Sequence, residues 1–211
     1  QFVHVREGFK GNHVDAAFGE GADLLLEHAA GLDVQVEDVS DNVAMFAIQG
    51  PKTKDVLEKT SSAPLGSIAR FACAWSKIAG NQCLISRTGY TGEDGFEIFV
   101  WNSPLSDPQK AQFVWEQLLE IGKPEGIVPC GLGARDVLRL EAGMCLYGTD
   151  MDELTNPYEA KLGFVVKLQK DFIGRQRLQE VKQNGTQRIR VGLVTIHRVI
   201  PRHGFEISKS G

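Results

Sequence analysis

Residues 71–101 read FACAWSKIAGNQCLISRTGYTGEDGFEIFVW, and this stretch decides the fold. Phe71 to Ile78 and Gln82 to Ser86 are two runs of strand-forming residues, and the short segment between them predicts a β-hairpin. A glycine-rich loop follows, and then Phe96 to Trp101 predicts another strand. Strands joined by short connections pair antiparallel, so residues 71–101 predict part of an antiparallel sheet.

The segments around this stretch add a second hairpin and single helices. Val34–Val39 and Val43–Ile48 predict two paired strands. Short hairpins interrupted by single helices, with no regular alternation of strand and helix, predict an α+β fold. In this fold an antiparallel sheet carries helices on one side, unlike a doubly wound parallel sheet. We expect the helices near residues 22–30, 51–57, 108–121, 131–142 and 170–183, and a loop over residues 9–21.

A domain boundary is expected near Gln183. Residues 1–183 then form one domain, and residues 184–211 form the first strands of a second, β-barrel domain, because residues 188–195 and 204–207 are again strand-like. The chain has no initiator Met, opens on a strand-like alternation and closes on a strand that runs into a turn. We therefore expect a fragment of a longer protein.

The composition excludes two classes of partner. The chain has 23 Lys plus Arg and 27 Asp plus Glu, a formal net charge of −4, so no large positive field is available to hold nucleic acid. No apolar run approaches the roughly 18 residues that a membrane-spanning helix needs. We expect no nucleic-acid or membrane partner, and a cytoplasmic location, or the mitochondrial matrix if the source is eukaryotic.

The histidines, tryptophans and cysteines show no sequence pattern typical of a catalytic or metal-binding site. The histidines have no distinctive context near a candidate nucleophile, so neither a Ser-His-Asp nor a Cys-His triad is predicted. The three tryptophans are expected in the core rather than on a stacking platform. The cysteines form no CxxC pair and no zinc-ligand spacing, so no metal is expected, and their apolar neighbours predict buried, reduced thiols in a reducing compartment. They are Cys73, Cys83, Cys130 and Cys145.

The loop Arg87–Gly95 and the strand after it hold the first concentration of unusual residues. Three glycines within seven positions of this loop indicate that its backbone comes close to another group. Glu97 points to the opposite face of its strand from Phe96 and Ile98. If that face lines a cavity, the carboxylate can accept two hydrogen bonds from an amino-pyrimidine edge. Otherwise Glu97 is a solvated residue on an edge strand.

A second concentration stands at the start of the helix predicted over residues 131–142. The sequence Gly131-Leu132-Gly133 is not a dinucleotide fingerprint, because Asp136 occupies the third glycine position. The N-terminus of this helix favours anions. Arg135 and Arg139 are like charges four positions apart, so one of them is expected to face an acid, with Asp136 and Glu141 as candidates. The spacing alone does not decide between an arginine–carboxylate pair and ligand binding.

At these motifs the sequence resembles the glycine cleavage system T-protein family, which are aminomethyltransferases that use tetrahydrofolate. The matching stretches span most of residues 34–211 and keep the family's order and spacing. The C-terminal halves of sarcosine and dimethylglycine dehydrogenases share a looser version, and the run from Arg135 to Asp150 favours the T-protein family. The matching stretches are residues 47–51, 88–98, 130–153 and 170–175.

The resemblance implies a transfer of the methylene carbon from an aminomethyl group, carried on the lipoyl arm of H-protein, to tetrahydrofolate with release of ammonia. The implied partners are lipoylated H-protein and folate, with tetrahydrofolate as co-substrate. The resemblance also implies that Glu97 binds the pterin, that Arg135 contacts the folate, and that Tyr90 lines the same cavity. A folate nitrogen attacks the methylene carbon, so the protein orients the pterin and manages protons rather than supplying a nucleophile.

The chain also departs from the family pattern. The family's essential Asp is expected before Gln1 and a folate-contacting Tyr beyond Gly211, so the catalytic residue in this chain is unknown. Residues 6–21 do not follow the family sequence. We expect a partial folate-binding domain, without the family's N-terminal subdomain and most of its C-terminal barrel. Two alternatives stay open: a folate-dependent demethylase or amine dehydrogenase module, and a noncatalytic folate-binding module.

Overall fold

The computed structural model describes the backbone of residues 2–7, 13–17, 21–200 and 204–208, and the side chains of residues 25–200 and 204–208. The strands are β1 (Phe2–Glu7), β2 (His13–Ala17), β3 (Val34–Asp38), β4 (Val43–Gln49), β5 (Cys73–Ile78), β6 (Asn81–Ser86) and β7 (Gly95–Trp101). The α-helices are α1 (Gly21–Ala29), α2 (Thr53–Glu58), α3 (Gln109–Gly122), α4 (Leu132–Glu141) and α5 (Arg175–Asn184). Short 3-10 turns lie at Ser40–Asn42, Leu65–Ser67, Lys123–Glu125 and Gly163–Val165.

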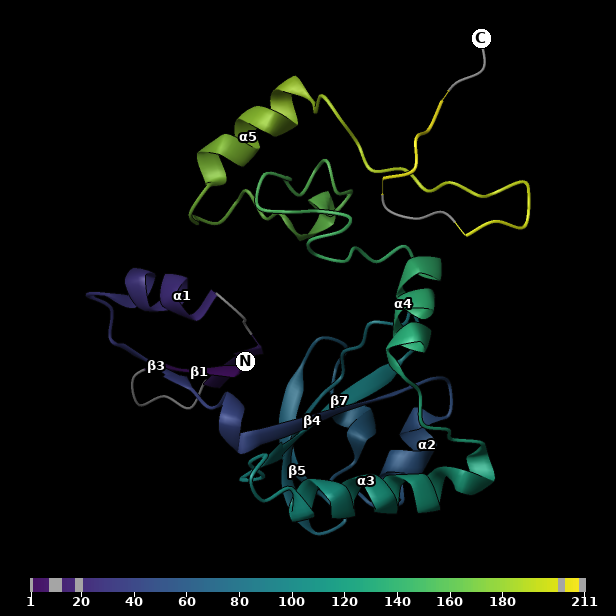
Figure 1. Cartoon of the computed structure of the whole chain (residues 1–211). Coiled ribbons are helices and arrows are strands. Elements are labelled where there is room, and N and C mark those ends of the chain that lie inside the picture. The colour runs from purple at the N-terminus through teal and green to yellow at the C-terminus, as the bar shows by residue number, and fades with distance from the viewer. Residues whose placement is uncertain (1, 8–12, 18–20, 201–203, 209–211) are drawn as a thin grey trace. The chain divides into compact units, whose positions relative to one another are not determined.

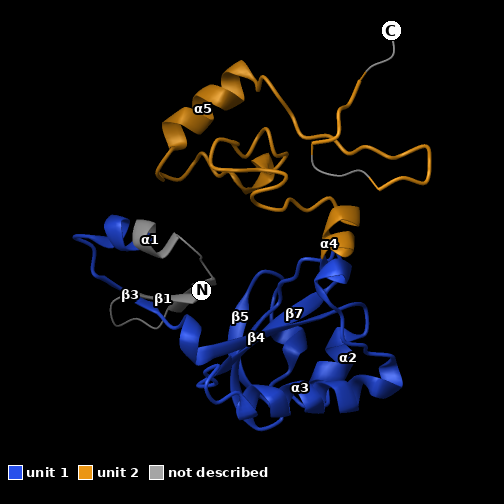
Figure 2. Cartoon of the chain, viewed as in Figure 1, with its two compact units in different colours: residues 1–135 blue, residues 136–211 orange. Residues whose placement is uncertain are grey.

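The strands form two antiparallel sheets. One sheet has three strands in the order β2-β1-β3, and the other has four in the order β4-β7-β6-β5 (Figure 1). The chain divides into two compact units, residues 1–135 and residues 136–211, which Figure 2 colours separately. Both sheets belong to the first unit. The boundary falls within α4, so the second unit contains the rest of α4, α5 and a series of turns.

The hairpin predicted within residues 71–86 is confirmed. Strands β5 and β6 pair antiparallel, with Ile78 opposite Asn81. The two residues between them, Ala79 and Gly80, have φ values of 47° and 78°. Positive φ at both central positions is the signature of the tight turn whose twist suits a two-residue hairpin. The strand predicted at 96–101 is also confirmed as β7, which lies between β4 and β6.

The hydrophobic core lies between one face of the four-stranded sheet and the helices α2 and α3. Alternate residues of β7 point to this face and are fully buried, namely Phe96, Ile98 and Val100. Helix α3 was predicted over 108–121 and buries Ala111, Val114 and Leu118, which share one helical face. The predicted α+β class, an antiparallel sheet with helices, is therefore confirmed. The remaining core residues are Ile48, Val56, Leu57, Leu65, Ile68, Ile78, Cys83 and Ile85.

The hairpin predicted from Val34 to Ile48 is wrong. Strand β3 pairs with β1, and β4 pairs with β7, so the two segments belong to different sheets. Between them residues 40–42 form a 3-10 turn, which redirects the chain instead of folding β4 back onto β3. The loop predicted over 9–21 is wrong at His13–Ala17, which is strand β2. Residues 9–12 and 18–20 of that prediction lie outside the described residues.

The second unit differs from the sequence prediction at its C-terminal end. Helix α5 begins at Arg175, after Gly174 in the left-handed conformation at φ 87°, rather than near residue 170. Residues 188–195 and 204–207, predicted as strands, have no strand structure among the described residues. A strand needs a hydrogen-bonded neighbour, and the apolar side chains of this segment, such as Val194 at 95% exposure, are not packed. The domain boundary near Gln183 and the barrel beyond it stay predictions.

The four cysteines lie in different surroundings. Cys83 is buried, and burial raises its pKa to about 11. Cys73 and Cys130 are exposed, so the prediction that each thiol is buried is wrong for these two. Their apolar neighbours in sequence lie on strand or loop surfaces that the described chain leaves open. Within the described part of the chain, no helix has the length and apolar character to cross a membrane.

Candidate functional site

Glu97 lies in the middle of the sheet, on the face opposite the core. Its strand β7 has β4 on one side and β6 on the other, with Ala47 and Ser86 directly opposite Glu97. The alternative that Glu97 is a solvated residue on an edge strand is therefore wrong. Its side chain is half-buried, and the Thr88 hydroxyl donates a hydrogen bond to the carboxylate.

Besides Ser86, aromatic and apolar side chains lie near Glu97 on this face of the sheet. The register places Phe99 two residues along the same side of β7, with Leu84 opposite it on β6. Trp75 and Trp101 meet edge to face, with ring centroids 5.2 Å apart. Trp75 is 40% exposed, so the expectation that the tryptophans lie in the core is wrong here. A carboxylate beside an aromatic surface suits a flat ring that also donates hydrogen bonds.

Contacts between Arg87 and Asp94 hold the two ends of the loop 87–95 together. Arg87 Nη2 lies 2.6 Å from Asp94 Oδ2, and Arg87 Nε donates to Asp94 Oδ1 at 3.1 Å. The hydrogen bond from Arg87 holds the pKa of Asp94 below its usual range. The Gly50 amide also donates to the Asp94 carbonyl at 2.9 Å. These contacts fix where the loop leaves β6 and where it enters β7.

Gln49 is a site residue that the sequence reasoning missed. Its side chain lies against the loop, where a Cβ added to Gly95 would be 2.5 Å from Gln49 Cδ, and one added to Gly89 would overlap the same amide. The prediction that the glycines of this loop bring its backbone close to another group is confirmed at Gly89 and Gly95. The glycine spacing was the available signal, but it did not identify the partner.

Tyr90 and Arg135 are brought together. Arg135 stands in the first turn of α4, and its guanidinium carbon lies 4.8 Å from the centroid of the Tyr90 ring. This is within the range of a cation–π interaction. Tyr90 belongs to the loop that leads into the strand of Glu97. The three predicted ligand contacts thus come from one loop, the strand that follows it and one helix terminus.

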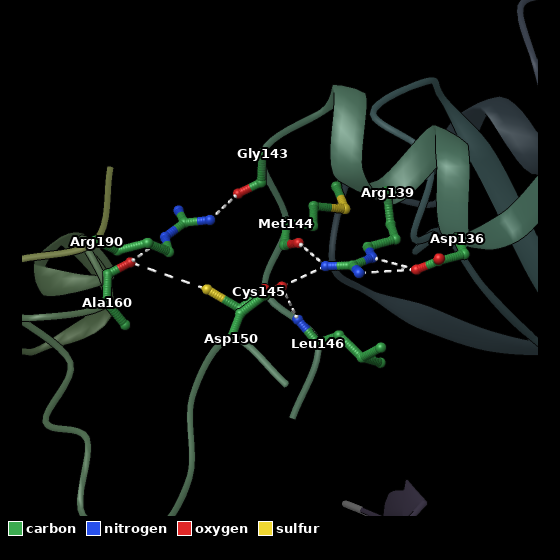
Figure 3. Close-up of polar contacts among 9 residues, drawn as sticks. All are labelled: Asp136, Arg139, Gly143, Met144, Cys145, Leu146, Asp150, Ala160 and Arg190. Carbon is green, nitrogen blue, oxygen red and sulfur yellow. Dashed lines mark hydrogen bonds and ion pairs between the residues drawn. The ribbon is translucent and has the colours of Figure 1, made fainter. Parts of the chain in front are cut away.

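Arg139, one helical turn further along α4, has a different environment. Its side chain is buried, at 5% exposure, and Figure 3 shows its guanidinium between two carboxylates. Nε donates to Asp136 Oδ1 at 2.8 Å, and Nη1 donates to Asp150 and to the Met144 carbonyl. Burial opposes the charge, but the hydrogen bonds to both acids outweigh it and raise the Arg139 pKa. The expectation that one arginine faces an acid is confirmed for Arg139, with Asp136 as one of two partners.

A second arginine ties the following segment together within the same unit. Arg190 Nη1 donates to the Gly143 carbonyl at 2.7 Å, and its Nε donates to the Ala160 carbonyl at 3.2 Å (Figure 3). The Leu146 amide donates to Asp150 at 2.9 Å. These contacts hold the chain after α4 in place, and the Leu146 amide shares Asp150 with Arg139.

The described residues differ in the chemistry that their side chains could provide. No group of three or more His, Cys, Asp and Glu side chains that could hold a metal ion occurs in the part of the chain that the structure describes. The available chemistry is a carboxylate acceptor, a cation stacked on a phenol ring, and an aromatic surface. Such a set can bind and orient a planar, partly anionic molecule.

Comparison with known sequences gives a consistent group of relatives. The family model of the GCVT N-terminal domain matches residues 14–170. An aminomethyltransferase of Clostridium botulinum (strain Loch Maree / Type A3) is 44% identical over 190 residues, which are 89% of this chain and 50% of that protein. The aminomethyltransferase of Bacillus subtilis (strain 168) is 45% identical over 190 residues, 89% of this chain and 51% of that protein.

Two further comparisons extend this result. An aminomethyltransferase of Caldanaerobacter subterraneus subsp. tengcongensis is 48% identical over 185 residues, 87% of this chain and 48% of that protein. The crystal structure of glycine cleavage system aminomethyltransferase T from Bartonella henselae is similar with a TM-score of 0.65 and 32% identity, over 82% of this chain and 45% of that chain. The chain spans about half the length of the curated relatives that it matches.

Proposed function

This chain belongs to the GCVT N-terminal domain family, and from this premise we propose that it binds tetrahydrofolate for aminomethyl transfer. In the proposed reaction, a folate nitrogen forms a bond to the methylene carbon of an aminomethyl group. A second folate nitrogen then bonds to the same carbon, and the bonds from that carbon to the amine and to the lipoyl sulfur break. The two protons released by the folate nitrogens leave on ammonia and on the freed thiol. The aminomethyl group is carried on the lipoyl arm of H-protein, which is the proposed partner.

The observation that carries this proposal is the placement of Glu97. Its carboxylate is half-buried on the open face of the sheet, in a central strand and next to aromatic side chains. The edge of a pterin carries an amino group and a ring nitrogen, which can donate two hydrogen bonds to one carboxylate. Hydrogen bonds to an ionised acceptor are stronger than those between neutral groups, so Glu97 can fix both the position and the orientation of the ring.

Arg135 and Tyr90 have complementary roles in the proposal. The side chain of Arg135 is exposed, while its guanidinium rests on the Tyr90 ring. An arginine can present planar, paired donors to a carboxylate of the folate tail. Tyr90 holds this cation at the loop that precedes Glu97. Holding the folate in one pose lowers the barrier by orientation, and this is the contribution that we assign to the described residues.

The first test is a calorimetric titration of the 211-residue chain with tetrahydrofolate. Glu97→Gln removes the charge of the acceptor and should weaken binding by about 1.5 to 3 kcal/mol, the range for a hydrogen bond to a charged group. Glu93→Gln makes the same change on an exposed residue of the loop and should leave the affinity unchanged. Equal affinity of the native chain and Glu97→Gln, with the fold intact, would remove Glu97 from the site.

The second test addresses transfer itself. Ammonia release is measured from aminomethylated H-protein in the presence of tetrahydrofolate, with a polypeptide that contains this chain. Glu97→Gln should lower the rate at subsaturating folate more than at saturating folate, because the residue is assigned to binding. A rate that does not depend on tetrahydrofolate would contradict the proposed reaction.

A further inference from the structure

Gln49, the last residue of β4, makes three side-chain hydrogen bonds to the loop and strand that carry the proposed ligand contacts. Its amide nitrogen donates to the Thr88 carbonyl at 3.1 Å and to the Phe96 carbonyl at 3.3 Å. Its amide oxygen accepts from the Thr91 hydroxyl at 3.2 Å. The NH2 group of the amide, which can only donate, meets two carbonyls, and its oxygen, which can only accept, meets a hydroxyl.

The Gln49 side chain also packs closely against two glycines. Gly95 stands directly opposite Gln49 in the pairing of β4 with β7, and a Cβ at Gly95 would be 2.5 Å from Gln49 Cδ. A Cβ at Gly89 would overlap the same amide. The loop therefore wraps the Gln49 side chain at both of its ends, and two glycines allow this close approach.

The residues held by Gln49 are next to the residues proposed to bind folate. Thr88, whose carbonyl accepts from Gln49, uses its hydroxyl to donate to Glu97. Phe96, whose carbonyl also accepts from Gln49, precedes Glu97 in β7. Tyr90 lies between Thr88 and Thr91, both of which Gln49 contacts, and it carries the cation–π contact to Arg135.

We propose that Gln49 is the positioning residue of this site: it holds the loop 87–95 so that Thr88 meets Glu97 and Tyr90 meets Arg135. The inference rests on the proposed function, since it assigns Gln49 a role toward the same folate. Gln49 acts through Thr88 and the loop, and it needs no contact with the ligand. The Arg87–Asp94 pair is a weaker tie, because Asp94 is 46% exposed and surface ion pairs add little.

The test combines hydrogen exchange with folate titration on the 211-residue chain. Gln49→Met keeps the length of the side chain and removes all three hydrogen bonds. We expect exchange of residues 88–95 to accelerate about tenfold and the tetrahydrofolate Kd to rise about tenfold, since several modest hydrogen bonds are lost. Exchange in the β5–β6 hairpin should stay unchanged. Gln82→Met, at an exposed glutamine of β6, is the matched control and should change neither quantity.

A double-mutant cycle separates positioning from general support of the fold. If Gln49 acts through Thr88 and Glu97, then Gln49→Met should weaken binding less than about threefold in a Glu97→Gln background. A residue that only stabilises the fold would cost the same factor in both backgrounds. Thr91→Val removes the hydroxyl that donates to Gln49 and accepts from the Glu93 amide at 3.3 Å, and should raise exchange and Kd about threefold even if Gln49→Met does not fold. Thr91→Ser keeps both hydrogen bonds and is its control.

The outcomes distinguish this inference from the proposed function. Unchanged exchange in residues 88–95 overturns the positioning role without reference to any ligand. A looser loop with unchanged folate affinity, while Glu97→Gln still weakens binding, overturns the inference and leaves the proposed function standing. If Glu97→Gln and Gln49→Met both leave the affinity unchanged, or if tetrahydrofolate does not bind, the proposed function fails and the inference fails with it.

Discussion

The guanidinium of Arg135 lies over the ring of Tyr90, with 4.8 Å between the guanidinium carbon and the ring centroid. This contact joins the first turn of α4 to the loop that precedes β7. A cation–π contact uses the charge of the guanidinium and not its N–H donors. The contact therefore orients the cation while keeping its donors available for an anion.

The first prediction concerns Arg135. Arg135→Ala should change the free energy of unfolding by less than about 1 kcal/mol, because an exposed cation–π contact contributes about 0.5–1 kcal/mol. The same substitution should weaken tetrahydrofolate binding by about tenfold or more, since a charge-assisted contact to the ligand is lost. Urea unfolding and calorimetric titration of one preparation measure both effects. A large loss of stability with unchanged affinity would assign Arg135 to the fold instead.

The second prediction reverses this ranking for Arg139. Its buried guanidinium is paired with Asp136 and Asp150, so Arg139→Ala leaves two carboxylates without their cation. Because Asp136 is 61% exposed and Asp150 27%, the loss is that of hydrogen bonds to charged groups, and the free energy of unfolding should fall by about 1.5–3 kcal/mol. Arg177→Ala is the control, because Arg177 is 79% exposed and pairs with Glu180 on the surface of α5, where the loss should be below about 1 kcal/mol. Equal losses for the two variants would contradict the assignment.

The third prediction uses two glycines that differ in the space around them. Gly95→Ala places a Cβ 2.5 Å from Gln49 Cδ and should destabilise the chain by about 1–3 kcal/mol through overpacking. Gly133→Ala adds a Cβ in the first turn of α4 with no atom within 4 Å, and should stabilise by about 0.5–1 kcal/mol. Both are measured by urea unfolding. In a Gln49→Ala background the cost of Gly95→Ala should fall, and a cost that persists there would place the strain elsewhere.

The fourth prediction concerns pH and the Arg87–Asp94 pair. The folded-state pKa of Asp94 is lowered by the hydrogen bond from Arg87. The pair therefore stabilises the fold fully above the unfolded pKa of about 3.9, and this stabilisation is lost as the pH falls through the lower, folded pKa. The difference in unfolding free energy between the native chain and Asp94→Asn should be largest above pH 5 and should shrink toward pH 2. A difference that grows on acidification would contradict a lowered folded-state pKa of Asp94.

Local patterns predicted the local elements well. The β5–β6 hairpin is specified by two apolar runs and the turn at Ala79-Gly80, and helix α3 lies within one residue of the predicted range 108–121. Each of these elements depends on residues that are close in sequence. The side of β7 on which Glu97 lies follows from the period of two, and the structure places Glu97 on the face opposite Phe96 and Ile98.

Long-range pairing could not be predicted in the same way. Strand β4 pairs with β7, about fifty residues later, and nothing in Val43–Gln49 identifies that partner in preference to the adjacent β3. Gln49 was missed for the same reason, because its role depends on the register that places it opposite Gly95. Residues 188–195 alternate like a strand, but alternation specifies a face and not a neighbour, and no described strand pairs with them.

The central claim is that the loop 87–95, the start of β7 and the start of α4 form one folate site. Hydrogen exchange of the chain with and without saturating tetrahydrofolate tests it most directly, because it maps protection along the sequence without a substitution. The account predicts slower exchange in peptides that cover residues 88–98 and 131–136, and unchanged exchange in α5 and in the β5–β6 turn. Protection confined to other segments, or no protection at saturating tetrahydrofolate, would contradict it.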